Sequence, residues 1–153
     1  MMSNDVMRSL RYILNVNDQK LVDIIALAGG AVSLADMQKM LLSDEHVNYL
    51  KCSDQVMAQF LDGLIYFRRG KDESKPPMPF ELPVTNNLVL KKLRVAFELK
   101  EDDMLAILKS TQYEIGRSEL SALMRKKDHP NYRPCGDQIL RYFLKGLQLK
   151  VRP

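Results

Sequence analysis

The chain contains two copies of one sequence, and this duplication constrains the possible folds more than any single motif. Residues 3–70 align without a gap with residues 86–153 at an offset of 83 positions, and 16 of the 68 aligned pairs are identical. The clearest shared block begins at His46 in the first copy and at His129 in the second. A repeat of fixed period indicates that each copy forms the same structural unit.

Chain length indicates whether each copy could fold by itself. The 153 residues suit one compact domain or two half-size units, and a copy of 68 residues alone would be only marginally stable. The sequence therefore predicts a first helical repeat at 3–70, a proline-rich linker at 71–85 and a second helical repeat at 86–153, with the two repeats packed together.

Apolar residues recur at the helical period in both copies. Over residues 6–14 they fall at i, i+1, i+4, i+7 and i+8, and residues 89–97 repeat the stripe. Asn4 and Asn87 stand just before these stripes, so we expect them to be N-caps.

Similar patterns predict three further helices in each copy. We expect them at 18–28, 33–42 and 54–67 in the first copy, and at 101–111, 117–127 and 137–149 in the second. No segment alternates convincingly as a strand would. The expected fold class is all-α, with two tandem pseudo-symmetric four-helix units.

A glycine lies in the middle of the most apolar helix of each copy, at Gly63 and Gly146. A mid-helix glycine costs about 1 kcal/mol relative to alanine. Its presence in both copies therefore indicates close backbone approach by another element. We expect the two fourth helices to cross there.

Composition excludes several classes of protein. Apolar residues make up 46% and charged residues 27%, as in ordinary globular proteins. No run approaches the roughly 20 apolar residues of a membrane span, and residues 1–11 lack the apolar core of a signal peptide. We expect a cytoplasmic protein with no membrane partner. Four prolines within residues 76–83 predict an extended spacer.

The excess positive charge belongs to the second copy. Residues 86–153 carry 14 Lys+Arg and 8 Asp+Glu, a net charge of +6, whereas residues 1–70 carry 7 and 8, a net charge of −1. Such asymmetry indicates an anionic partner, of which nucleic acid is the usual one, although solvated lysines give the same count. The candidate binding residues are Arg11, Lys91, Arg94, Arg117, Arg125, Lys126 and Lys127.

Each copy also carries a histidine six residues before a cysteine, and these four residues are the candidates for metal or thiol chemistry: His46, Cys52, His129 and Cys135. Zinc accepts a Cys2His2 set, but the short spacing that specifies such sites is missing. Asp54 and Asp137 follow the cysteines where helix N-caps belong. We therefore expect no metal, no cofactor and no disulfide.

Three functional classes remain open. The first is a non-enzymatic binding module that takes nucleic acid through the basic second repeat. The second is a protein-interaction or structural protein whose partner contacts methionine-rich surfaces, including Met37 and Met40. The third, a metal- or thiol-dependent enzyme, would use the His/Cys pairs.

Three stretches resemble a known family: residues 3–12, residues 60–74, which read FLDGLIYFRRGKDES, and residues 88–103. They are similar to the bacterial YehS-like family of unknown function, domain-of-unknown-function family 1456, in two tandem copies. The resemblance covers essentially the whole chain. It implies a short, duplicated bacterial protein and brings no activity, cofactor or catalytic residue.

Overall fold

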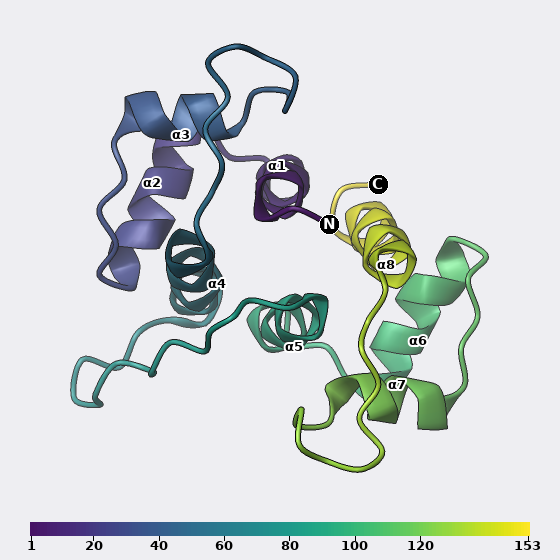
Figure 1. Ribbon diagram of the computed structural model, residues 1–153. Coiled ribbons are helices and arrows are strands. Elements are labelled where there is room, and N and C mark those ends of the chain that lie inside the picture. Colours follow the sequence, from purple (N-terminus) through teal and green to yellow (C-terminus); the bar gives the residue numbers. More distant parts are fainter. The chain divides into compact units, whose positions relative to one another are not determined.

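The computed structural model describes all 153 residues and is entirely helical, which confirms the predicted fold class. The chain divides into two compact units, which Figure 1 colours from purple to teal and from teal to yellow. The first unit comprises residues 2–84, and the second comprises residues 85–153 together with Met1.

Each unit contains four helices. The first unit consists of α1 (Ser3–Leu14), α2 (Asp18–Leu27), α3 (Leu34–Met40) and α4 (Asp54–Arg69); the second consists of α5 (Asn86–Ala96), α6 (Glu101–Ser110), α7 (Arg117–Met124) and α8 (Asp137–Val151). Every helix of the second unit begins 83 residues after its counterpart, so the copies have equivalent secondary structure. The third helices end two to three residues earlier than predicted.

Backbone conformation is also shared where the sequence is not. Gly29 ends the second helix of the first unit with φ 84°, and the equivalent Gln112 adopts φ 63°. Asn15 and Glu98 form a second such pair, at φ 54° and 53°. The left-handed turn therefore occurs in both copies, although only the first has the glycine that favours it.

The core of each unit forms around its fourth helix. Phe60 of α4 and Phe143 of α8 are fully buried, and α2 packs along α4 as α6 packs along α8. Figure 1 shows both pairs as neighbouring ribbons. The methionines Met37 and Met40 are 0% and 5% exposed, so the prediction that they form a partner surface is wrong. They face inward because their helix, α3, packs against α2.

The repeated glycines mark a close approach, but not the expected one. A Cβ added at Gly63 would lie 1.9 Å from the carbonyl oxygen of Ile24 in α2, and one added at Gly146 would lie 2.2 Å from that of Ile107 in α6. The second helix of the same unit therefore occupies the space above each glycine. The expectation that the two fourth helices cross there is wrong, because periodicity shows that a helix is approached but not by which element.

The predicted N-caps are displaced. Met2 and Thr85 cap α1 and α5, which places Asn4 and Asn87 inside the first turn. Ser53 caps α4 through a bond from the Val56 N–H, and Gly136 precedes α8. Asp54 and Asp137 are consequently first-turn residues, where a carboxylate still favours the positive end of the helix dipole.

Asn4 and Asn87 instead hold the long loop that precedes the fourth helix. Asn4 Nδ2 donates to Met40 O and Leu50 O, both at 2.9 Å, and Asn4 Oδ1 accepts from Cys52 N at 2.9 Å. Asn87 makes the same three bonds to Leu123 O, Arg133 O and Cys135 N, at 3.0, 2.8 and 2.8 Å; both side chains are buried.

The proline-rich segment lies against the first unit. Lys71 Nζ donates to the last carbonyl of α2, Leu27 O, at 3.1 Å, and Met78 N donates to the Tyr66 hydroxyl at 3.2 Å. Near its end, Val84 N donates to Asp54 Oδ2 at 3.2 Å. The segment is thus bound along α4 by polar contacts.

Candidate functional site

The principal candidate site is the segment after α7, residues 125–133, which we call the basic loop. It contains Arg125, Lys126 and Lys127, and the side chains of the two lysines are exposed and form no ion pair. Lys91 of α5 donates from Nζ to Arg125 O at 3.0 Å, which joins it to the loop. Four of the seven predicted binding residues therefore lie together.

The other three predicted binding residues have partners within their own unit. Arg11 Nε contacts Asp18 Oδ1 at 2.6 Å, and Arg94 Nε donates to Leu99 O at 3.2 Å. Arg117 bonds to Asp102, which raises the pKa of the guanidinium, and lies 3.7 Å from Glu101. These arginines are weaker candidates for an external anion, because a ligand would compete with an internal acceptor.

The aligned loop of the first unit has the opposite charge. Residues 42–46 read Leu-Ser-Asp-Glu-His and carry −2, whereas residues 125–129 read Arg-Lys-Lys-Asp-His and carry +2. The scaffold is the same in both: His46 Nδ1 accepts from Asn48 N at 3.0 Å, and His129 Nδ1 accepts from Asn131 N at 3.0 Å. One structural frame thus presents two different electrostatic surfaces.

A second polar contact exists only in the second unit. Arg125 Nη1 lies 3.3 Å from His129 Nε2, and the Nε of Arg125 is buried without a hydrogen-bond partner. The first unit has Leu42 at the position of Arg125. His129 was predicted only as a weak metal ligand. Aligning the two loops position by position shows that an arginine stands four residues before His129 where a leucine stands before His46, but not that the two side chains are in contact.

The geometry does not favour the His/Cys pairs as reactive sites. Cys52 and Cys135 are 3% and 6% exposed, and their thiols donate to Ser53 O and Gly136 O at 3.5 Å. Nδ1 of each histidine already accepts a hydrogen bond from a backbone N–H of its loop. Within each unit no three His, Cys, Asp or Glu side chains gather as metal ligands would. The four candidate side chains instead make hydrogen bonds to the backbone of the loops that contain them.

Burial raises the pKa of Cys52 to about 12 and that of Cys135 to about 11, with a smaller contribution from the following aspartates. Both thiols are therefore neutral at physiological pH, whereas nucleophilic attack requires the thiolate.

We expect both thiols to resist alkylation in the folded protein at pH 8 and to react quickly after denaturation. Because their pKa values are raised from 9.0 in the folded state, the protein loses stability as pH rises from about 9 toward 11–12. Mass spectrometry after iodoacetamide treatment, with and without denaturant, measures the first effect, and denaturant midpoints across this pH range measure the second. Rapid labelling of the native protein would contradict the assigned burial.

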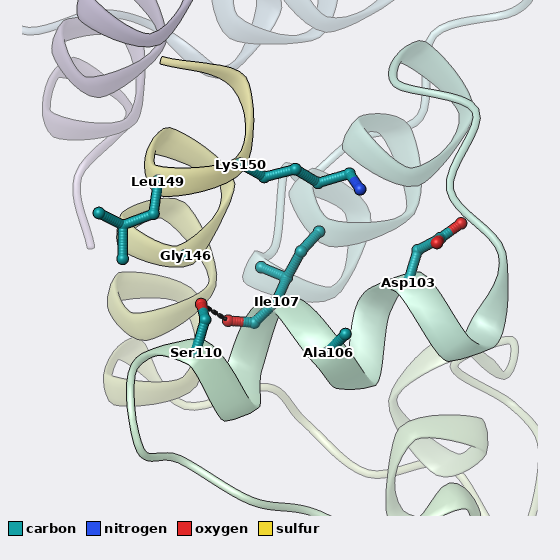
Figure 2. Close-up of a pocket in the computed structure, with 7 residues that line it drawn as sticks. All are labelled: Asp103, Ala106, Ile107, Ser110, Gly146, Leu149 and Lys150. Carbon is teal, nitrogen blue, oxygen red and sulfur yellow. Dashed lines mark hydrogen bonds between the residues drawn. The ribbon is translucent and has the colours of Figure 1, made fainter. Parts of the chain in front are cut away.

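A cavity of about 230 Å³ opens between α6 and α8 of the second unit (Figure 2). It is lined by Asp103, Ala106, Ile107, Ser110, Gly146, Leu149 and Lys150. The equivalent positions in the first unit include Leu27 and Phe67 in place of Ser110 and Lys150, and Lys20 lies 5.5 Å from the Phe67 ring centroid. Smaller or more flexible side chains therefore leave the second unit open where bulky ones stand in the first.

Comparison with known proteins identifies the family of the chain. The family model described as "Protein of unknown function (DUF1456)" matches residues 3–70 and 86–152, which are the two copies. The chain belongs to this family. A relative from Escherichia coli strain K12, the uncharacterized protein YehS, is 49% identical over 147 residues, which cover 96% of this chain and 94% of the relative. No solved structure matches.

The family match confirms the resemblance seen in the sequence, and it supports a duplicated architecture of unknown function. None of the eight helices combines the length and apolar character needed to cross a membrane.

Proposed function

We propose that the chain is a non-enzymatic binding module that holds the phosphates of nucleic acid on its basic loop. One observation carries the proposal: residues 125–129 of the basic loop carry +2, whereas the aligned residues 42–46 on the same scaffold carry −2. The folding bonds of the frame, made by Asn4 or Asn87 and by the histidines, are present in both copies. Folding therefore does not account for the added cations.

The chemistry of the loop suits phosphate more than base recognition. Lys126 and Lys127 are exposed, whereas the loop contains a single aromatic side chain, the partly buried Tyr132, and not the series of aromatic platforms that stacks unpaired bases. Lysine and arginine contacts to phosphate fix position and supply affinity without reading sequence. We therefore infer binding that is largely independent of sequence and strongly dependent on salt. A cytoplasmic location belongs to the same proposal, because both cysteines are free and buried.

The test is a fluorescence-anisotropy titration of a labelled duplex at 50 and 200 mM salt. Replacing Lys126 and Lys127 by glutamate should weaken binding about tenfold or more at the lower salt concentration. It should also reduce the slope of log affinity against log salt by about 1–2, since each lost phosphate contact contributes about 0.9.

A matched control is the double variant Lys39→Glu and Lys51→Glu. It makes the same change in net charge at exposed positions of the first unit. We expect it to retain most of the affinity. Equal loss in both double variants, or no binding by the parent at micromolar concentration in 50 mM salt, would refute the proposal.

A second candidate function, protein interaction, is favoured by the α6/α8 cavity. In the first unit, Leu27 and Tyr66 line a cavity together with Pro77, Met78 and Phe80 of the proline-rich segment, and Met78 N donates to the Tyr66 hydroxyl. Their equivalents in the second unit, Ser110 and Leu149, line the α6/α8 cavity, and no proline-rich segment contributes to its lining. The duplication thus indicates the occupant: an extended apolar peptide that contains proline.

This candidate function is tested by measuring the binding of a labelled peptide, with the sequence of residues 71–84, to the full-length chain. The variant Asp103→Lys with Lys150→Phe places the Lys20 and Phe67 pair of the first unit into the second, where it should fill the cavity. We expect the peptide to bind the parent and to bind this variant much more weakly. Equal binding to both proteins would exclude the cavity as the site.

A further inference from the structure

At His129 a hydrogen-bond donor of the ring faces a donor of Arg125, and an anion between them could accept from both. Nδ1 of His129 accepts a hydrogen bond from Asn131 N at 3.0 Å, so the neutral ring carries its proton on Nε2. Nε2 lies 3.3 Å from Arg125 Nη1. A guanidinium has donors and no acceptor. Two donors therefore face each other across this contact.

The other tautomer does not remove the conflict. If Nε2 accepted from Arg125, the ring proton would stand on Nδ1 and face the Asn131 N–H across the shorter of the two distances. His46 makes the same backbone bond in the first unit, where no arginine is present. We therefore assign the backbone bond as fixed by the scaffold and the contact with Arg125 as the unsatisfied one.

Arg125 has a second unsatisfied donor, because its Nε is buried without a hydrogen-bond partner. From another helix, α5, the ammonium of Lys91 donates to Arg125 O and adds positive charge. Lys126 and Lys127 follow directly, and Asp128 is the one carboxylate within residues 125–131. The surroundings thus provide several donors and an excess of positive charge.

We propose that Arg125 and His129 together hold one phosphate oxyanion, whose oxygens accept from the guanidinium and from the His129 Nε2–H. The inference rests on the proposed function in that the phosphate belongs to a nucleic-acid backbone. Charge-assisted hydrogen bonds from arginine to phosphate are short and strong, and a fork of donors suits the tetrahedral group. Lys126 and Lys127 then contact the neighbouring phosphates.

The chain contains two histidines, so nuclear magnetic resonance provides an internal control. Long-range ¹H–¹⁵N spectra record the ring nitrogens of His129 and His46 during a titration with inorganic phosphate, against chloride at equal ionic strength and pH. We expect a saturable shift at His129 Nε2 and no shift at His46. Both rings should carry the proton on Nε2 before phosphate is added.

Two variants separate the site from general charge effects. Arg125→Leu, which introduces the first unit's residue, should abolish the phosphate response of His129, and unchanged backbone amide signals of α6 and α8 would show that the second unit keeps its fold. Arg125→Lys keeps the charge but loses the fork, so phosphate should bind about tenfold more weakly than to the parent. A full response in Arg125→Leu, or equal shifts of both histidines in the parent, would overturn the assignment.

Titration with a nucleic-acid duplex distinguishes this site from the proposed function. If the duplex binds while His129 does not respond to it or to phosphate, the Arg125 and His129 site is refuted and the proposed function stands. If inorganic phosphate shifts His129 while the duplex does not bind, the site is supported as a small-anion site and the nucleic-acid function is refuted.

Discussion

Replacing Gly63 by alanine is expected to lower the free energy of unfolding by about 3 kcal/mol, and replacing Gly146 should have a similar effect. The added Cβ would lie 1.9 Å from Ile24 O or 2.2 Å from Ile107 O, far inside any real contact. The obstructing atom in each case is backbone, so a whole helix must move. Overpacking of a core costs typically 1–3 kcal/mol and sometimes more.

The sign of this effect is informative, because helix propensity acts in the opposite direction. Alanine in place of a mid-helix glycine would otherwise stabilise by about 1 kcal/mol. Gly136→Ala is a control for an added Cβ that meets no atom within 4 Å; because Gly136 is the N-cap of α8, where alanine is less favourable than glycine, we expect a loss of about 1 kcal/mol or less. Urea denaturation of the three variants measures the differences. Midpoints of Gly63→Ala and Gly146→Ala at or above the parent's would show that α2 and α6 do not approach so closely.

The helices could be predicted because local signals and the duplication agree. Each apolar stripe occurs twice at the same offset, and the helix starts at Asp18 and Glu101 coincide with acidic first turns in both copies. Tertiary partners could not be predicted in the same way. The sequence marks Gly63 as a point of close approach, but one-dimensional periodicity does not indicate whether α2 or a fourth helix lies above it.

The candidate site shows a similar limit. Counting charges identifies the second copy as the basic one, and four of the predicted residues lie together around the basic loop. The candidates also include Arg117 and, because it is identical to Arg94, Arg11 of the first copy; the carboxylate partners of both depend on the fold. The contact between Arg125 and His129 depends on side-chain orientation across one turn, to which composition and spacing are not sensitive.

The repeated asparagines show how a correct signal can receive the wrong role. Asn4 and Asn87 are identical in the two copies, and a polar residue at the start of an apolar stripe is typical of an N-cap. The helices begin two residues earlier than that role requires, and both side chains turn inward. An amide with one acceptor and two donors suits the three backbone groups of the loop.

Replacing Asn4 by alanine is accordingly expected to lower the free energy of unfolding by about 3 kcal/mol. The change leaves Met40 O, Leu50 O and Cys52 N without their partner, and an unsatisfied buried group costs about 1–3 kcal/mol. Water that reaches the loop in the variant should satisfy some of these groups, so the total loss is smaller than three full penalties. Asn87→Ala should have a similar effect, because Asn87 makes the same three bonds. Urea denaturation of each single variant measures the loss.

Asn48→Ala is the matched control for the asparagine variants. Asn48 lies in the same loop, its side chain is exposed and only its backbone N–H bonds to His46. Exposed substitutions of this kind usually change stability by less than about 0.5 kcal/mol. A further consequence is specific to the network: freeing Cys52 N should loosen the loop and speed alkylation of Cys52 in Asn4→Ala, while Cys135 stays protected. Unchanged stability and unchanged Cys52 protection in Asn4→Ala would show that the asparagine does not hold the loop.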